Sequence, residues 1–177
     1  MPEPLSDSDF DALDPRFRWM RDYLRGIAPP GRLPGRHQVD PPVFGRLLPF
    51  INLVDVERHG DDVRFRFRLV GTAQSIVAGR EITGKYVEEA VLPEYVYRIR
   101  SNMALATARG RPVHDAFAMP HPGREFIHTE RVYFPLASDG TTVDMILILN
   151  AYPHDPDFNT VKLPPLPRTR TSPPPPL

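Results

Sequence analysis

The chain has 177 residues, 41% of them hydrophobic, which is enough apolar material for one folded core with tails. Its 22 basic side chains balance 22 acidic ones, so it lacks the basic excess of proteins that bind nucleic acids or anionic membranes. Cysteine is absent, which excludes disulfides, thiolate metal sites, a cysteine nucleophile and a flavin photoadduct through cysteine.

The chain shows no targeting signal. Its first residues are acidic and lack the basic start and apolar run of a signal peptide, and no stretch approaches the roughly 18 apolar residues that span a bilayer. We therefore expect a cytoplasmic protein with no membrane partner. Arginine far outnumbers lysine, which occurs only at Lys85 and Lys162, and this bias is typical of GC-rich coding sequences and predicts a bacterial source.

The first predicted helix begins at Asp14 and Pro15, a capping residue followed by proline at the first helical position, and ends near Gly26. Residues 1–13 before it are expected to be disordered. Because so short a helix is marginal alone, its apolar face must pack on the sheet or on a second copy of the chain. We expect five of its side chains to form an interface: Phe17, Trp19, Met20, Tyr23 and Leu24.

Two strands follow a helical turn or two that start at Asp40. The first strand runs over residues 50–57 and the second over residues 63–70, where apolar side chains and arginines alternate strictly. One face of the second strand is therefore core, and the other is a stripe formed by Arg64, Arg66 and Arg68. The stripe is interpreted as a solvated or ion-paired face, with binding of an acidic partner or a phosphate as the alternative.

The middle of the chain is helical. Thr72 can cap a short helix that extends to Ala78, and a longer amphipathic helix begins at Pro93 and ends at Gly110. Residues 79–85 match the first seven positions of a phosphate-binding loop, but a tyrosine replaces the hydroxyl residue that would hold magnesium. A turn between helical segments is the preferred interpretation.

Three more strands are predicted over residues 113–119, 126–136 and 142–151. The last is apolar on both faces, so the sheet must be covered on both sides, by the N-terminal helix or by a second copy. The element order predicts an α+β fold with a five-stranded antiparallel sheet, helices on one face and an additional N-terminal amphipathic helix. We expect one domain over residues 14–152 and a disordered proline-rich tail over residues 153–177, with a polyproline ligand as the alternative for the tail.

Several segments resemble a family of bacterial single-domain PAS proteins first catalogued as a domain of unknown function. They are Leu33-Pro34, Val39-Asp40-Pro41, Leu48-Pro49, residues 65–72, residues 79–84 and Phe134-Pro135-Leu136. The resemblance covers residues 15 to 152. It implies a sensory module in signal transduction that holds a small ligand between the sheet and the long helix. It also implies a homodimer formed through the N-terminal helix and signalling by contact with a partner protein.

The pocket residues expected to face that ligand are Phe65, Phe67, Leu69, Ile76, Ile99, Met103, Phe117 and Tyr133. The alternative is that they simply fill the core, because close packing is the default for apolar interiors. The ligand is unknown, and haem is not expected because residues 94–109 contain no histidine.

No set of residues favours catalysis. His114, His121 and His128 lie on predicted strands and a loop, without a helical face to gather them around a metal. Glu130 and Arg131 are interpreted as cross-strand ion-pair partners rather than as a catalytic pair. We therefore expect a regulatory protein and not an enzyme, with a ligand-free dimerisation or interaction adapter as the alternative.

Overall fold

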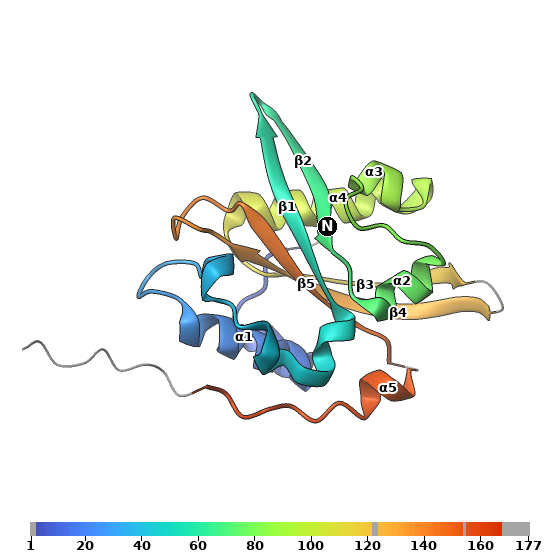
Figure 1. Cartoon of the computed structure of the whole chain (residues 1–177), viewed down its shortest axis with the longest axis horizontal. Helices are drawn as coiled ribbons and strands as arrows, with labels where there is room; N and C mark the ends of the chain where they lie inside the picture. The colour runs from blue at the N-terminus through green and yellow to red at the C-terminus, as the bar shows by residue number, and fades with distance from the viewer. Residues whose placement is uncertain (1–2, 122–123, 154, 168–177) are drawn as a thin grey trace, which may run out of the picture.

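The computed structural model describes residues 3–121, 124–153 and 155–167. Five antiparallel strands form one sheet in the order β2-β1-β5-β4-β3, so the last strand of the chain lies at its centre (Figure 1). The strands are β1 (Ile51–His59), β2 (Asp62–Leu69), β3 (Val113–His121), β4 (Arg124–Leu136) and β5 (Met145–Ala151). This is the predicted sheet, with the same five segments.

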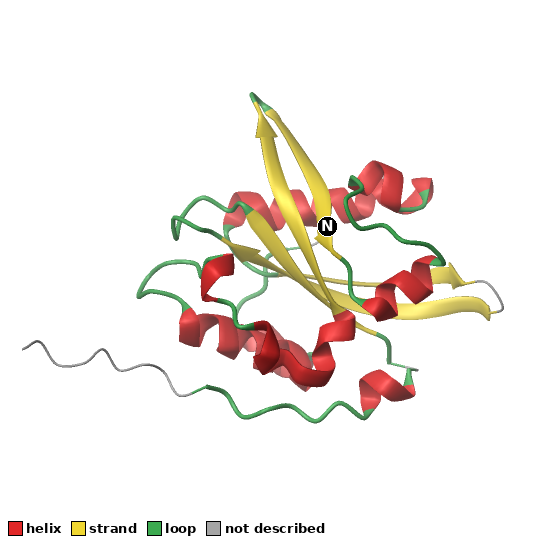
Figure 2. Ribbon diagram, in the orientation of Figure 1, coloured by secondary structure: helices red, strands yellow, loops and turns green. Residues whose placement is uncertain are grey.

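Helices cover both faces of the sheet (Figure 2). One face carries α4 (Pro93–Arg109) and α3 (Val87–Ala90), with α2 (Thr72–Ala78) beside them. The other face carries α1 (Pro15–Ile27) and the 3-10 helix η3 (Pro41–Phe50). The remaining helical segments are η1 (Ser8–Ala12), η2 (Arg36–Gln38) and α5 (Pro156–Asn159). Within the described residues, none of the helices has both the length and the apolar character to cross a bilayer.

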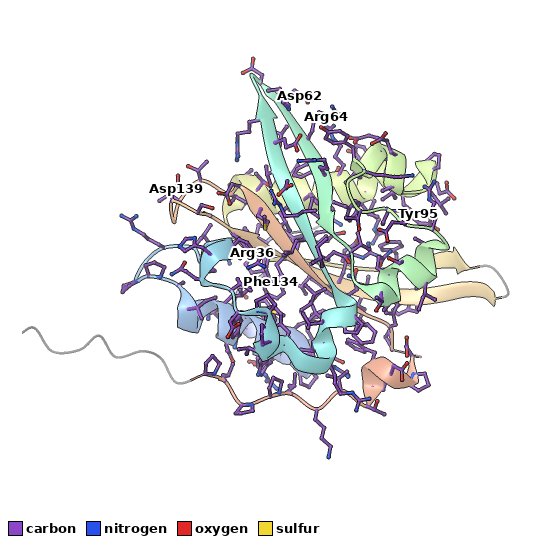
Figure 3. The ribbon with its side chains drawn as sticks, in the orientation of Figure 1. Arg36, Asp62, Arg64, Tyr95, Phe134 and Asp139 are labelled. Carbon is purple, nitrogen blue, oxygen red and sulfur yellow. The ribbon has the colours of Figure 1, made fainter. Side chains whose placement is uncertain are left out.

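Successive side chains of β5 point to opposite faces of the sheet, and this explains why two cores form. Ile146 and Ile148 pack toward α4, whereas Leu147 and Leu149 pack toward α1. Figure 3 shows Phe134 of β4 in the layer between the sheet and α1, where it is 2% exposed. The predicted cover on both faces of the last strand is therefore confirmed, and α1 of the same chain provides it on one side.

The predicted start of α1 and the predicted end of α4 are also confirmed, whereas Thr72 does not cap α2, because Gly71 stands at that position and no side chain caps the helix. The Asp14 side chain accepts a hydrogen bond from the Arg16 amide at 2.9 Å and caps α1. Gly110 ends α4 with a φ of 59°, a left-handed conformation that glycine adopts without strain. The glycine-rich segment after α2 forms a turn whose end pairs with β2, since the Phe67 amide donates to the Lys85 carbonyl at 2.9 Å.

The structure corrects the expected interface on α1. Phe17, Trp19, Met20, Tyr23 and Leu24 all belong to the core of their own chain, and none is more than 7% exposed. The amphipathic pattern identified the buried face of the helix, but it could not distinguish the chain's own sheet from a second copy as the covering surface.

The expected domain limits need the same kind of correction. At the N-terminus, Phe10 is 1% exposed and the Leu5 amide donates to the Pro112 carbonyl at 2.8 Å. After β5, Phe158 is 1% exposed and packs edge-on against Phe50, with the ring centroids 5.0 Å apart. Both segments therefore belong to the folded unit, and Pro167 is the last residue of the second one that the structure describes. The rest of the predicted tail, residues 168–177, lies outside the described residues.

The arginine stripe on β2 is a partnered strand face. Arg66 Nε donates to Glu57 at 2.6 Å, and Arg68 Nε donates to Asp55 at 2.6 Å. The guanidinium of Arg64 lies 3.5 Å from the centroid of the Tyr86 ring. The ion-paired interpretation is therefore confirmed for two of the arginines, and the third is packed on an aromatic ring.

Candidate functional site

A cavity of about 290 Å³ lies between the sheet and the helices α2, α3 and α4. Its apolar walls come from β2, α4 and β5, through Phe67, Ile99, Met103 and Ile148. Its polar lining includes three buried side chains from separate elements: Asn52 on β1, Gln74 on α2 and Arg131 on β4. A concave apolar site with a few converging polar groups is typical of small-molecule binding sites.

Asn52 joins the cavity to the turn before α2. Its side-chain oxygen accepts a hydrogen bond from the Gly71 amide at 2.9 Å. Only glycine fits at that turn, because a Cβ there would lie 2.2 Å from the Pro49 carbonyl oxygen. The start of α2 is thus held directly against the beginning of β1.

Gln74 is held by a buried tyrosine. The Tyr152 hydroxyl donates to Gln74 Oε1 at 2.5 Å. Burial raises the pKa of Tyr152 to about 12, so this hydroxyl stays protonated at neutral pH and remains a donor. In the structure the side-chain oxygen of Gln74 therefore faces Tyr152.

Arg131 lies in a polar row that crosses three strands. It pairs in register with Asp115 of β3 on one side and with Asn150 of β5 on the other, so all three lie on the α4 face of the sheet. Its guanidinium contacts Thr129 Oγ1 at 3.4 Å and lies 4.8 Å from the centroid of the Phe117 ring. These contacts position a permanent cation in the wall of the cavity.

Asp115 is engaged by α4. Arg98 Nε donates to its two carboxylate oxygens at 2.9 and 3.1 Å, and Arg98 Nη2 donates at 2.5 Å. These hydrogen bonds raise the pKa of Arg98. The pair of Arg98 and Asp115 therefore fixes α4 to β3 beside the cavity.

Nearby, burial raises the pKa of the Tyr133 hydroxyl, and the charge of Arg131 opposes that rise.

The structure brings six of the eight predicted pocket residues into one layer. Phe65, Phe67, Ile99, Met103, Phe117 and Tyr133 are all buried between the sheet and α4. Of these, Phe67, Ile99 and Met103 line the cavity. Their expected position is confirmed, and their role in ligand binding stays a prediction.

The expected positions of Leu69 and Ile76 are wrong. Leu69 is the last residue of β2 and is 44% exposed, because the strand ends there and the register with β1 shifts at Leu53 and Val54. Ile76 is 74% exposed because α2 turns Gln74, Val77 and Ala78 toward the cavity instead.

Sequence reasoning missed the polar part of the site. Glu130 and Arg131 were interpreted as cross-strand ion-pair partners, but adjacent residues on a strand face opposite sides, so the two belong to different faces of the sheet. Glu130 lies 3.5 Å from His114 on the neighbouring strand and 4.0 Å from His128, on the α1 side. A usable signal existed, since Arg131 lies two residues from Tyr133 and Asn52 lies two from Val54, which places both on the inward face.

The predicted histidine positions are only partly described. His114 and His128 both lie beside Glu130, and the side chain of His121 is outside the described residues. In the part of the chain that the structure describes, no three His, Cys, Asp or Glu side chains are grouped to hold a metal ion.

A second hollow of about 840 Å³ lies between η3, α2 and α5, and Leu48 and Ile76 are among its lining residues.

Similar folds occur in solved structures with low sequence identity. The PAS-B domain of Cycle from Drosophila melanogaster, solved with bound glycerol, is 14% identical, with a TM-score of 0.43 over 58% of this chain and 98% of that chain. A LOV protein from Rhodobacter sphaeroides is 12% identical, with a TM-score of 0.46 over 81% of this chain and 70% of that chain. A fungal LOV domain photoreceptor is 14% identical, with a TM-score of 0.40 over 79% of this chain and 92% of that chain.

Sequence comparison assigns the family. A search of curated proteins finds no significant match. The family model described as a PAS domain matches residues 17–149, which is more than half of the chain. The bacterial source stays a prediction, whereas the resemblance to PAS proteins is confirmed: the chain belongs to the PAS domain family, a family of sensory modules.

Proposed function

We propose that this PAS domain binds a small molecule in the cavity between the sheet and α4 and passes a signal to another protein by contact. The observation that carries the proposal is the 290 Å³ cavity with its buried polar groups Asn52, Gln74 and Arg131. Burying polar groups is costly unless hydrogen bonds compensate, so their convergence on a hollow favours binding over simple core packing. The role is regulatory and not enzymatic, and we place it in the cytoplasm.

The helix α2 offers a route from the cavity to the surface. Gln74 lines the cavity, and Ile76 on the same helix is 74% exposed. A ligand that contacts Gln74 would displace α2, and the displacement would change the surface that Ile76 presents to a partner. Such a change requires the ligand to favour one position of α2 over another.

The test is native mass spectrometry of the purified protein with two matched variants. Ala90→Leu adds bulk at a buried residue that lines the cavity, whereas Ala104→Leu makes the same change at an exposed position of α4. We expect a bound small molecule in the parent and in Ala104→Leu, and its loss in Ala90→Leu. Bare polypeptide in the parent would overturn the proposal.

The second candidate is a ligand-free adapter that forms homodimers or binds another protein. Exposed apolar side chains favour it, since Tyr97 is 83% exposed and Leu48 and Ile76 line the second hollow together. Sedimentation of the same samples separates the candidates. A dimer without any bound small molecule supports the adapter.

A further inference from the structure

The buried polar side chains that line the cavity offer it hydrogen-bond donors rather than acceptors. Asn52, Gln74 and Arg131 are only 3%, 8% and 5% exposed, and they reach it from β1, α2 and β4. A buried amide can accept through its oxygen and donate through its nitrogen, so its partners elsewhere in the protein decide which group remains for a ligand.

At Asn52 the oxygen is already used. It accepts from the Gly71 amide at 2.9 Å, and a backbone N–H can only donate, so this contact fixes the orientation of the side chain. Among the described residues, none accepts a hydrogen bond from Asn52 Nδ2. The NH₂ group is therefore what Asn52 offers to the cavity.

At Gln74 the same arrangement recurs. Its Oε1 accepts from the Tyr152 hydroxyl at 2.5 Å, and the raised pKa of Tyr152 keeps that donor protonated. Across the described part of the chain, Gln74 Nε2 has no acceptor either. Arg131, the third polar group, carries only N–H donors and a permanent charge.

We infer that the cavity selects a small carboxylic acid with an apolar body, a conclusion that rests on the proposed function and names its ligand class. Two amide NH₂ groups present donors and a guanidinium presents a positive charge, and a carboxylate is the compact group that can accept from the donors and pair with the charge. The apolar body contacts Phe67, Ile99, Met103 and Ile148. A ligand with an amine in the same position would leave the NH₂ groups of Asn52 and Gln74 without an acceptor and would meet the positive charge of Arg131, at a cost in affinity.

The test compares three probes that share one body: phenylacetate, phenylacetamide and phenethylamine. Calorimetry should show the tightest binding for the acid and the weakest for the amine. In Gln74→Glu the oxygen that accepts from Tyr152 is kept, but the donor is replaced by a negative charge, and acid affinity should fall about tenfold or more. Thr83→Glu adds the same charge on an exposed residue of the turn after α2 and should leave acid affinity unchanged.

Two outcomes overturn this inference: no preference for the acid over the other probes, or an acid affinity that Gln74→Glu leaves intact. Native mass spectrometry then shows which conclusion has failed. A bound molecule without a carboxylate removes the ligand class and leaves the proposed function in place. If the parent carries no small molecule and binds none of the probes, the proposed function fails as well.

Discussion

The indole of Trp19 donates a hydrogen bond from Nε1 to the carbonyl oxygen of Pro164, with an N···O distance of 2.8 Å. The indole is itself held by stacking on Tyr23, with ring centroids 5.6 Å apart and an angle of 6° between the planes. Figure 1 shows the segment that follows α5 running beside α1. This bond therefore joins the first long helix to the end of the described chain.

Replacing Trp19 with phenylalanine keeps an aromatic ring beside Tyr23 but removes the donor to Pro164. We expect the free energy of unfolding to fall by about 1–2 kcal/mol, because a partly buried hydrogen bond and part of the packing are lost. Urea denaturation followed by circular dichroism measures the change. Tyr97→Phe alters a ring that is 83% exposed and should leave stability as it is. An equal loss in both variants would contradict the structural role of the bond.

Phe158 anchors the segment after β5. It is 1% exposed, packs on Phe50, and has the guanidinium of Arg16 3.9 Å from its ring centroid. We expect Phe158→Ala to cost about 3–5 kcal/mol in the free energy of unfolding, as for other large core truncations. Leu166→Ala, in the same segment but 45% exposed, should cost little. Similar midpoints for Phe158→Ala and the parent in thermal melts would restore the original boundary at Tyr152.

Most of the fold could be predicted from the sequence because local patterns determine it. The strict alternation of apolar and charged residues along β2 indicates a half-buried strand, and the apolar run from Met145 to Leu149 indicates a strand buried on both faces. Asp14 and Gly110 mark helix ends through backbone chemistry that operates within a few residues. Signals of this kind do not depend on what the element packs against.

The errors concern contacts between distant parts of the chain. The tail was judged from the average composition of its residues, so Phe158 in the proline-rich end was not recognised as a core residue. Its partner Phe50 is more than 100 positions away in the sequence. The polar part of the site was missed for a related reason, because the residues expected to face the space between the sheet and the long helix were chosen from apolar and aromatic side chains alone. The burial of Arg131 depends on its neighbours on adjacent strands, which the sequence alone does not name.

Asp139 in the turn between β4 and β5, labelled in Figure 3, should titrate far below an ordinary aspartate. Backbone hydrogen bonds from Thr141 and Thr142, at 2.8 and 2.7 Å, lower its pKa from 3.8 to about 2. A carboxylate with a depressed folded-state pKa stabilises the protein above pH 3.8, and that contribution is lost as the pH falls toward 2.

Carboxyl NMR measures the titration of Asp139 directly, and urea denaturation of Asp139→Ala gives its effect on stability. We expect Asp139→Ala to be less stable than the parent at pH 7, with a difference that shrinks between pH 4 and pH 2. Asp157→Ala changes another exposed aspartate and serves as the control for added or lost charge. A midpoint for Asp139 near 4 would contradict the role of the two amides.

Gly71 occupies a tight backbone crossing at the start of α2. Its φ of −63° suits any residue, so the requirement for glycine is one of space and not of conformation. A Cβ would lie 2.2 Å from the Pro49 carbonyl oxygen near the end of η3 and 2.8 Å from the Ile51 carbonyl oxygen at the start of β1. Both are backbone atoms, so neither can move without displacing the junction between η3 and β1.

We expect Gly71→Ala to lower the free energy of unfolding by about 1–3 kcal/mol, because overpacking forces the backbone apart. It should also weaken ligand binding, since the Gly71 amide orients Asn52. Gly26→Ala, at an exposed position of α1, is the matched control and should raise stability by about 0.5–1 kcal/mol through helix propensity. Urea denaturation and calorimetry with phenylacetate report the two effects separately. If Gly71→Ala unfolds and binds as the parent does, the turn is not held against β1 in this way, and the fixed orientation of Asn52 must be abandoned.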